Sequence, residues 1–213
     1  MITPEQNSGL IPVTIWYDYI WPWCYIGLAR LDQLAQEYPL KVTYMSYYLN
    51  PGIPPEGRAP KLKKDEKVGD HLTGYIGEIA DEIGLTMKRA PLTPNTRMAF
   101  EASEFAKDKD RFEEFHRACY RALWEDGLDL GQISVLQQLG EEVGLDSEEL
   151  KTVLDTGQYT SRTKEQYDRA ISLGVNGIPS FIIGGYFFSG AQPYEAFKRV
   201  VEIVKASNHS RLT

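Results

Sequence analysis

YDYIWPWCYIG, residues Tyr17 to Gly27, lies where a hydrophobic run ends and a helical pattern begins. The hydrophobic run, Val13 to Trp16, predicts a strand, and the segment Trp23 to Tyr38 predicts a helix. Cys24 would lie in the first helical turn, where the helix dipole and unpaired backbone N–H groups stabilise a thiolate. Trp21 stands three residues earlier, where a Cys-x-x-Cys pair has its first cysteine. The stretch therefore suits thiol chemistry but holds one sulfur where two are usual.

A second strand follows the helix. Pro39 ends the helical pattern, and Leu40 to Leu49 is rich in β-branched and aromatic residues. A strand, a helix and a strand at this spacing predict a βαβ unit, whose two strands are parallel and joined by a right-handed crossover.

A long helical region comes next, after the breakers between Pro51 and Gly57. From about Lys61 to Gly174 the sequence shows helical patterns and almost no strand pattern. The expected helices run about Lys63 to Ile83, Asn95 to Lys107, Arg111 to Trp124, Gln132 to Val143, Ser147 to Asp155 and Ser161 to Leu173. We interpret residues 61–174 as an inserted helical domain.

Strand character returns near the carboxyl end. Ser180 to Ile183 and Tyr186 to Ser189 flank Gly184-Gly185, which predicts a β-hairpin, and Tyr194 to Ala206 predicts a final helix. The order βαβ, helical insertion, ββα is that of an α/β thioredoxin-like fold with a large helical insertion. Residues 11–50 and 175–206 would form the discontinuous thioredoxin-like domain.

Several motifs resemble one protein family. They are Tyr17 to Gly27, Gly177 to Phe181, Phe188 to Pro193, the helix start Pro94 to Thr96 and the turn Asp126 to Gly131. Together, and in this order, they resemble the DsbA-like superfamily of the thioredoxin fold, especially its FrnE-like branch. This superfamily also includes 2-hydroxychromene-2-carboxylate isomerases and kappa-class glutathione transferases.

The resemblance implies a site. Pro179 would be a cis proline facing the active-site helix, so that the backbone of Ile178 can pair with a peptide or with glutathione. Cys24 matches the second, more buried cysteine of the family pair, and Trp21 replaces the nucleophile, so these two are the candidate catalytic residues. The candidate substrate- or glutathione-binding residues are Trp23, Asn50, Asn95, Ile178, Pro179, Ser189, Gly190, Ala191 and Gln192.

Structural roles compete with these assignments. Cys24 could be a small buried residue under the helix start, and the turn from Ser189 to Gln192 could be only a turn. Cys119 shares an apolar helix face with Phe112, Phe115 and Leu123, which predicts a core residue. His116 lies next to that face, so we expect it at the boundary or in solvent.

Composition narrows the function classes. The net charge of −7 argues against nucleic acid, and no apolar run is long enough to cross a membrane. Met1 to Gly9 lacks a signal-peptide core, so we expect a cytoplasmic protein. The three histidines show no metal-ligand spacing, and the two cysteines form no disulfide framework. We expect no metal and no tightly bound cofactor.

Three functions remain open. The first is a thiol–disulfide oxidoreductase with a degenerate Trp-Pro-Trp-Cys motif, in which Cys24 acts with an external thiol such as glutathione. The second is a glutathione-dependent isomerase or transferase of the hydroxychromene-carboxylate isomerase type, with glutathione as co-substrate. The third is a non-catalytic binding protein. A small thiol or a peptide would be the partner, and the resemblance also implies a homodimer as one assembly state.

Overall fold

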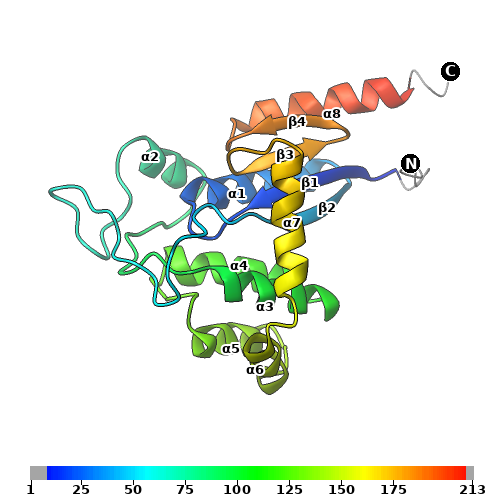
Figure 1. Cartoon of the computed structure of the whole chain (residues 1–213). Coiled ribbons are helices and arrows are strands. Elements are labelled where there is room, and N and C mark those ends of the chain that lie inside the picture. Colours follow the sequence, from blue (N-terminus) through cyan, green and yellow to red (C-terminus); the bar gives the residue numbers. More distant parts are fainter. Residues whose placement is uncertain (1–8, 210–213) are drawn as a thin grey trace.

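The computed structural model describes residues 9–209 of the chain, so residues 1–8, on which the expectation about a signal peptide largely rested, lie outside it. Figure 1 shows how its helices and strands are arranged. In chain order they are β1 (Ile11–Tyr17), α1 (Pro22–Glu37), β2 (Leu40–Ser46), α2 (Tyr75–Glu82), α3 (Arg97–Asp108), α4 (Phe112–Trp124), α5 (Ile133–Glu142), α6 (Ser147–Thr156), α7 (Thr160–Ser172), β3 (Ser180–Ile183), β4 (Tyr186–Ser189) and α8 (Tyr194–His209).

The sheet has the strand order β2-β1-β3-β4. β1 pairs with β2 in parallel, from Ile11 opposite Leu40 to Tyr17 opposite Ser46. β3 is antiparallel to β1, and β4 is antiparallel to β3. This topology confirms the α/β thioredoxin-like fold. The apolar run of β1 is explained by its central place, because it is covered by neighbours on both sides.

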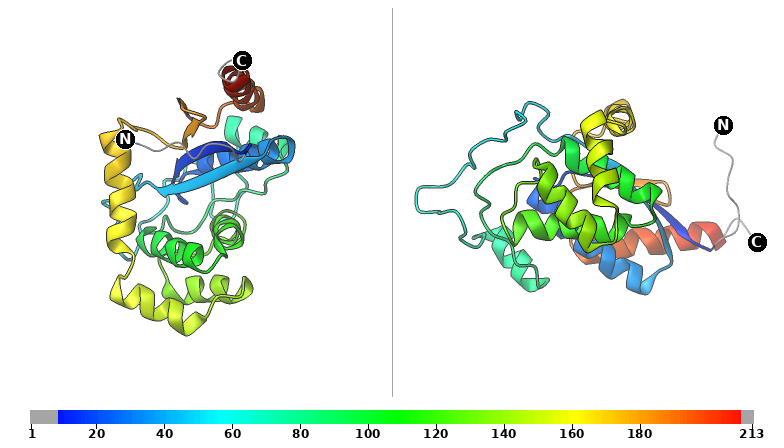
Figure 2. Two further views of the ribbon diagram at one scale, coloured as in Figure 1. Left: turned by 90° about the vertical axis from the view of Figure 1, so that its right-hand side faces the viewer. Right: turned by 90° about the horizontal axis from the view of Figure 1, so that it is seen from below.

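Helices surround the sheet and extend well beyond it. In Figures 1 and 2, α8 lies at one end of the molecule and α5 and α6 lie at the other, with the sheet between them. α8 packs against α1 and β3, while α7 runs alongside and contacts both β2 and α3. The helices between β2 and β3 thus return to the sheet through α7.

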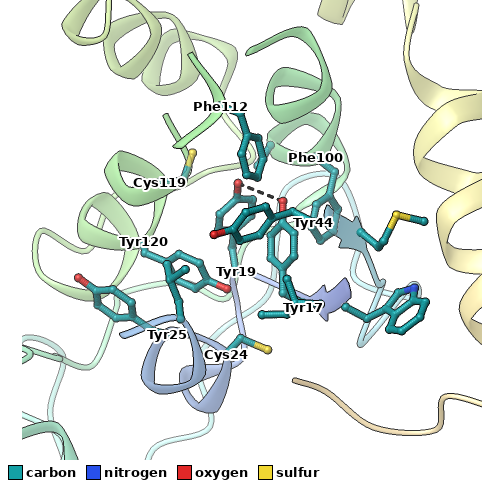
Figure 3. Close-up of a cluster of buried hydrophobic side chains, with 14 of the residues drawn as sticks. Tyr17, Tyr19, Cys24, Tyr25, Tyr44, Phe100, Phe112, Cys119 and Tyr120 are labelled. Carbon is teal, nitrogen blue, oxygen red and sulfur yellow. Dashed lines mark hydrogen bonds between the residues drawn. The ribbon is translucent and has the colours of Figure 1, made fainter. Parts of the chain in front are cut away.

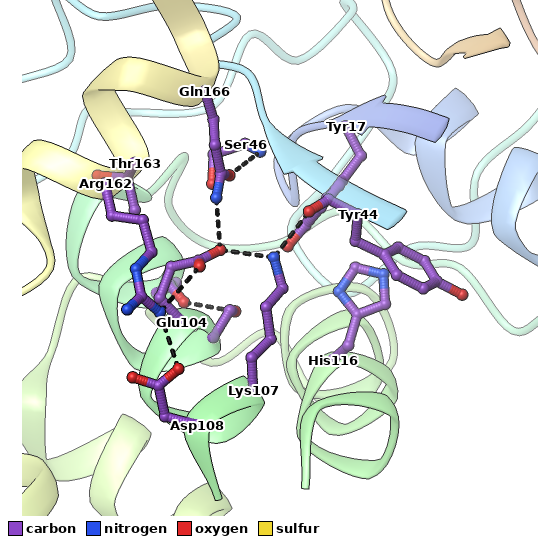
Figure 4. Close-up of polar contacts among 12 residues, drawn as sticks. Tyr17, Tyr44, Ser46, Glu104, Lys107, Asp108, His116, Arg162, Thr163 and Gln166 are labelled. Atoms are coloured by element: carbon purple, nitrogen blue, oxygen red, sulfur yellow. Dashed lines mark hydrogen bonds and ion pairs between the residues drawn. The ribbon is translucent and has the colours of Figure 1, made fainter. Parts of the chain in front are cut away.

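Buried charges join α7 to this framework (Figure 4). The carboxylate of Glu104 on α3 accepts from Lys107 Nζ at 2.6 Å and from Gln166 Nε2 on α7 at 2.9 Å. Lys107 also donates to the carbonyl of Tyr44, and Gln166 Oε1 accepts from the N–H of Ser46, both at 2.7 Å. These bonds fix α3 and α7 to the outer edge of β2.

The expected helix from Lys63 to Ile83 is wrong in its first half, since α2 begins only at Tyr75. Gly69 and Gly74 have positive φ angles, which interrupt a helix, and the charged stretch between Lys61 and Lys67 has little apolar surface to bury. The segment is instead held by backbone pairing, including the isolated bridges between Arg58 and Thr93 and between His71 and Lys88.

β2 is also shorter than expected. It ends at Ser46 rather than at Leu49. The N–H of Leu49 donates to the carboxylate of Asp18 instead of continuing the strand.

His116, on α4, is buried among aromatic rings that include Tyr17 and Phe112, so its expected place at the boundary is wrong. Its Nδ1 is 2.9 Å from the hydroxyl of Tyr19, which is also 2.6 Å from Ser103 Oγ. Burial, with nearby cations, lowers the pKa of His116 well below its ordinary value, so the ring is neutral. Cys119 is buried too, which confirms it as a core residue.

Candidate functional site

The strand–helix junction shapes the site. α1 begins at Pro22, whose ring suits the first helical position, and the carbonyl of Trp21 accepts from the N–H of Cys24 at 2.8 Å. The side chain of Trp21 is 37% exposed, which makes it one of the exposed large apolar residues. An aromatic surface is therefore presented at the position where the resemblance implied a nucleophile.

Cys24 faces the other way, into the core (Figure 3), and it is 0% exposed. Burial raises the pKa of its thiol well above the ordinary value, although the backbone N–H of Asp18 partly opposes this shift. The expectation that the helix start stabilises a reactive thiolate is therefore wrong, because desolvation outweighs the helix terminus. The competing interpretation, a buried residue under the helix start, fits the structure.

Pro179 lies against α1. The Ile178–Pro179 peptide bond is cis. A Cβ added to Gly27 would lie 3.0 Å from Pro179 Cγ and 3.2 Å from Phe181 Cζ, so glycine favours this close approach of the helix and the loop. Ile178 is buried, and within residues 9–209 its backbone makes no hydrogen bond, so its N–H and carbonyl are unpaired next to Pro179.

The turn from Ser189 to Gln192 uses its side chains internally. Ser189 Oγ is 3.0 Å from Ser180 Oγ, and Gln192 Nε2 donates to the carbonyl of Ser189 at 2.9 Å. The N–H of Gly190 donates to the carbonyl of Pro179. Of the donors expected here for glutathione, the N–H of Ala191 is the one without a partner in the described part of the chain.

A cavity of about 520 Å³ opens beside Trp21. We call it the junction cavity. It is bounded by the start of α1, the loop after β2, segment 89–94 and the end of α4. Its lining consists of Ile20, Trp21, Pro22, Leu49, Asn50, Arg58, Pro60, Lys61, Leu62, Arg89, Ala90, Leu92, Thr93, Pro94, Leu123 and Trp124.

The lining is apolar with three cations. Arg58, Lys61 and Arg89 line the cavity together with no carboxylate, although the whole chain has a net charge of −7. The structure thus brings Trp21 and Asn50 into one cavity. Ile178, Pro179 and the turn from Ser189 to Gln192 are outside its lining.

Two other predicted residues have structural partners. Asn95 donates from Nδ2 to the carbonyl of Ile53 at 2.6 Å and accepts from the N–H of Arg97, so it fixes the start of α3. The ring of Trp23 lies 5.8 Å from that of Tyr75, at the contact between α1 and α2. Neither lines the junction cavity.

Asp18 is a residue that sequence reasoning missed. Its Oδ2 accepts from the N–H of Leu49 at 2.9 Å and its Oδ1 accepts from the N–H of Ile20 at 3.3 Å. Ile20 and Leu49 both line the cavity, so this buried carboxylate ties two of its walls together. Burial raises the pKa of Asp18 to about 7, despite these donors. The sequence feature that could have revealed it is the position of Asp18 between Tyr17 and Tyr19, at the end of an apolar strand.

Trp124, at the end of α4, was also missed as a site residue. It is buried, and its Nε1 donates to the carbonyl of Tyr19 at 2.8 Å. Its ring forms part of the cavity lining.

A second hollow lies beside the outer edge of β2. It has a volume of about 390 Å³. We call it the β2 hollow, and it is lined by Val42, Thr43, Tyr44, Lys107, Asp110, Phe112, Glu113 and Glu114.

Metal-ligand clusters and membrane-spanning helices are both absent from the described residues. Between residues 9 and 209 no three His, Cys, Asp or Glu side chains are grouped closely enough to hold a metal ion. No helix in the same range is long and apolar enough to cross a bilayer.

Comparison with known proteins gives a family and relatives. Residues 12–202 match the model of the DSBA-like thioredoxin domain. The protein YwbO of Bacillus subtilis is 25% identical over 90% of this chain and 96% of its own length. A 2-hydroxychromene-2-carboxylate isomerase of Pseudomonas putida is 24% identical over 84% of this chain and 88% of its own length.

Solved structures agree in fold. A probable DsbA oxidoreductase from Streptomyces coelicolor has a TM-score of 0.79 at 25% identity, covering 92% of this chain and 90% of its own. A 2-hydroxychromene-2-carboxylate isomerase has a TM-score of 0.73 at 18% identity, covering 95% and 99%.

Proposed function

The chain belongs to the family of DSBA-like thioredoxin domains, whose relatives include oxidoreductases and isomerases, and on this premise we propose that it is a glutathione-dependent isomerase or transferase. In this proposal glutathione supplies the reactive thiol and the protein positions it. The observation that carries the proposal is the burial of Cys24. A sulfur that is 0% exposed, with a raised pKa, is poorly placed to attack a substrate.

The remaining features support a bound thiol compound. The N–H and carbonyl of Ile178 have no partner in the described residues, and they would pair with the cysteinyl part of glutathione. The N–H of Ala191 could meet one of its carboxylates near the start of α8. The junction cavity, on the side of Trp21, would hold the second substrate. Several relatives are named as isomerases that act on 2-hydroxychromene-2-carboxylate, which makes that compound the first substrate to test.

The burial of Cys24 weighs against the oxidoreductase hypothesis. A disulfide cycle needs a thiolate that reaches its substrate, and Trp21 supplies no second sulfur. An oxidoreductase would have to expose Cys24 by moving the start of α1, where Cys24, Tyr25 and Ile26 are all buried.

The test measures glutathione binding and turnover with the wild type and with Cys24→Ala. We expect calorimetry to detect glutathione binding at millimolar ligand or below, and isomerisation of 2-hydroxychromene-2-carboxylate to require glutathione. Cys24→Ala should retain both, because the sulfur takes no part. Folding of the variant is checked by circular dichroism.

Insulin reduction, with and without glutathione, serves as the opposing assay. Reduction by the wild type that disappears in Cys24→Ala would establish the oxidoreductase and refute the proposal. Glutathione binding without turnover of isomerisation or conjugation substrates would favour the non-catalytic binding protein instead.

A further inference from the structure

Arg58 occupies an unusual position in the junction cavity. It is exposed and lines the cavity, yet no carboxylate lies within ion-pair distance of it among residues 9–209. Its partner is Asn50. With the amide oriented so that both groups are satisfied, Asn50 Oδ1 accepts from Arg58 Nη1 at 2.9 Å and from Nη2 at 3.0 Å. A neutral amide therefore orients the guanidinium without cancelling its charge.

The backbone of Arg58 is fixed as well. Its N–H donates to the carbonyl of Thr93 at 3.0 Å, and its carbonyl accepts from the N–H of Thr93 at 2.9 Å. Gly57 has a φ of 75°, and a Cβ there would lie 2.7 Å from Leu92 Cδ2. Glycine is therefore required for the chain to approach segment 89–94 at this point. Both the backbone and the head group of Arg58 are thus held in place before any ligand binds.

The other two cations of the lining differ from Arg58. Arg89 is already paired, because its Nη2 lies 2.5 Å from Glu66 Oε1. Lys61 is exposed as well, but its ammonium is a point charge that no hydrogen bond to the described residues orients. Arg58 alone of the three combines a fixed orientation with an uncancelled charge.

We infer that Arg58 is the residue by which the junction cavity recognises a carboxylate on a flat, apolar ligand, and that Asn50 positions it. The apolar part of such a ligand would lie against the rings of Trp21 and Trp124 and the side chain of Leu92. The guanidinium still has N–H groups that can meet a carboxylate, because an arginine carries five. This inference rests on the proposed function and deepens it, because it names the residue that would select a carboxylate in the same cavity.

The assignment gives Asn50 a different role from the one its sequence position suggested. Asn50 was expected to touch substrate or glutathione. It acts instead through Arg58, so it is a positioning residue. Asn50→Asp tests whether the neutrality of this partner matters, because aspartate can accept both hydrogen bonds but neutralises the arginine.

The experiment compares 1-naphthoate with its neutral analogue 1-naphthamide by titration calorimetry. For the wild type we expect naphthoate to bind about tenfold or more tightly than naphthamide. Arg58→Gln should abolish this preference by weakening naphthoate while leaving naphthamide unchanged. Asn50→Asp should do the same, whereas Arg58→Lys should keep part of the preference. Lys61→Gln is the matched control and should change naphthoate affinity by less than about threefold.

Three results would overturn the inference. They are equal binding of the two probes by the wild type, no naphthoate binding at several millimolar, and an unchanged preference in a folded Arg58→Gln. An Asn50→Asp variant that binds naphthoate like the wild type would show that the neutrality of the partner is irrelevant, which would also contradict the inference. These titrations contain no glutathione, so they test the inference separately from the proposed function. If the protein binds naphthoate selectively but does not bind glutathione in its own titration, the proposed function is refuted and this inference stands.

Discussion

The junction cavity and the β2 hollow use charge in opposite ways. In the β2 hollow, the amine of Lys107 is bonded to Glu104 and to the carbonyl of Tyr44, so its charge holds α3 against the sheet. In the junction cavity, the guanidinium of Arg58 is hydrogen-bonded to the neutral amide of Asn50, so its charge is not cancelled. The first arrangement stabilises the fold, and the second leaves a cation ready for a ligand. A charged lining by itself therefore does not identify a binding site. Whether each charge is paired with an opposite charge determines whether it is available to a ligand.

The largest expected effect concerns Asp18, the buried acid behind the junction cavity. Its pKa is about 7 in the folded chain and near 3.9 when unfolded. Between these values the folded state keeps a proton that the unfolded state loses, so the free energy of unfolding falls as pH rises. The loss is complete above about pH 7 and amounts to as much as about 4 kcal/mol.

Urea unfolding of the wild type and Asp18→Asn measures this. Between about pH 5 and about pH 8 we expect the free energy of unfolding of the wild type to fall by about 3 kcal/mol relative to that of Asp18→Asn. His116, whose lowered pKa acts in the opposite direction, is present in both proteins and cancels. Parallel pH curves would mean that Asp18 does not titrate in this range.

The second effect tests the structural role of the β2 hollow. Lys107→Met leaves the buried carboxylate of Glu104 without its closest cation, so we expect a loss of about 3 kcal/mol in the free energy of unfolding. Arg162 Nη1, at 3.6 Å from Glu104, limits the loss. Arg58→Gln is the control and should cost under about 0.5 kcal/mol. Similar losses of stability in both variants would show that the charges of the two regions do not differ in their contribution to the fold.

The smallest effect concerns the two tryptophans of the cavity. Trp124→Phe removes the hydrogen bond to the carbonyl of Tyr19, so we expect a loss of about 1 kcal/mol. Trp21→Phe, at an exposed ring with no hydrogen bond from its indole in the described residues, should change stability by less than about 0.5 kcal/mol. Thermal unfolding with matched buffers is sufficient, and a larger effect at Trp21 would show that its ring supports the fold.

Local patterns were enough to predict most of the framework. The hydrophobic run of β1, Pro39 after α1 and the Gly184-Gly185 turn each depend on residues close in sequence, and each feature is present. Asp146 also accepts from the N–H of Glu149 as a helix cap should. The segment from Lys63 failed because its structure depends on backbone pairing with a distant segment, which leaves no periodic signal.

The site was harder to predict for the same reason. The motif located Trp21, Cys24 and Pro179, but the cations of the junction cavity come from irregular segments that meet only in the folded chain. The ionisation of Cys24 could not be predicted from the helix start, because it depends on the core that buries this residue. Burial, rather than position along a helix, sets the pKa of its thiol.

Residues 58–72 pair with residues 87–93 through backbone hydrogen bonds, and this affects which side chains of the protein can change. Backbone bonds join Arg58 to Thr93, Gly69 to Arg89 and Leu72 to Met87. This outer wall is built from main-chain contacts that most side chains would satisfy. Its surface residues can therefore be exchanged while the sheet stays intact. Libraries confined to residues 58–62 would be the natural place to search for altered ligand preference in the same scaffold.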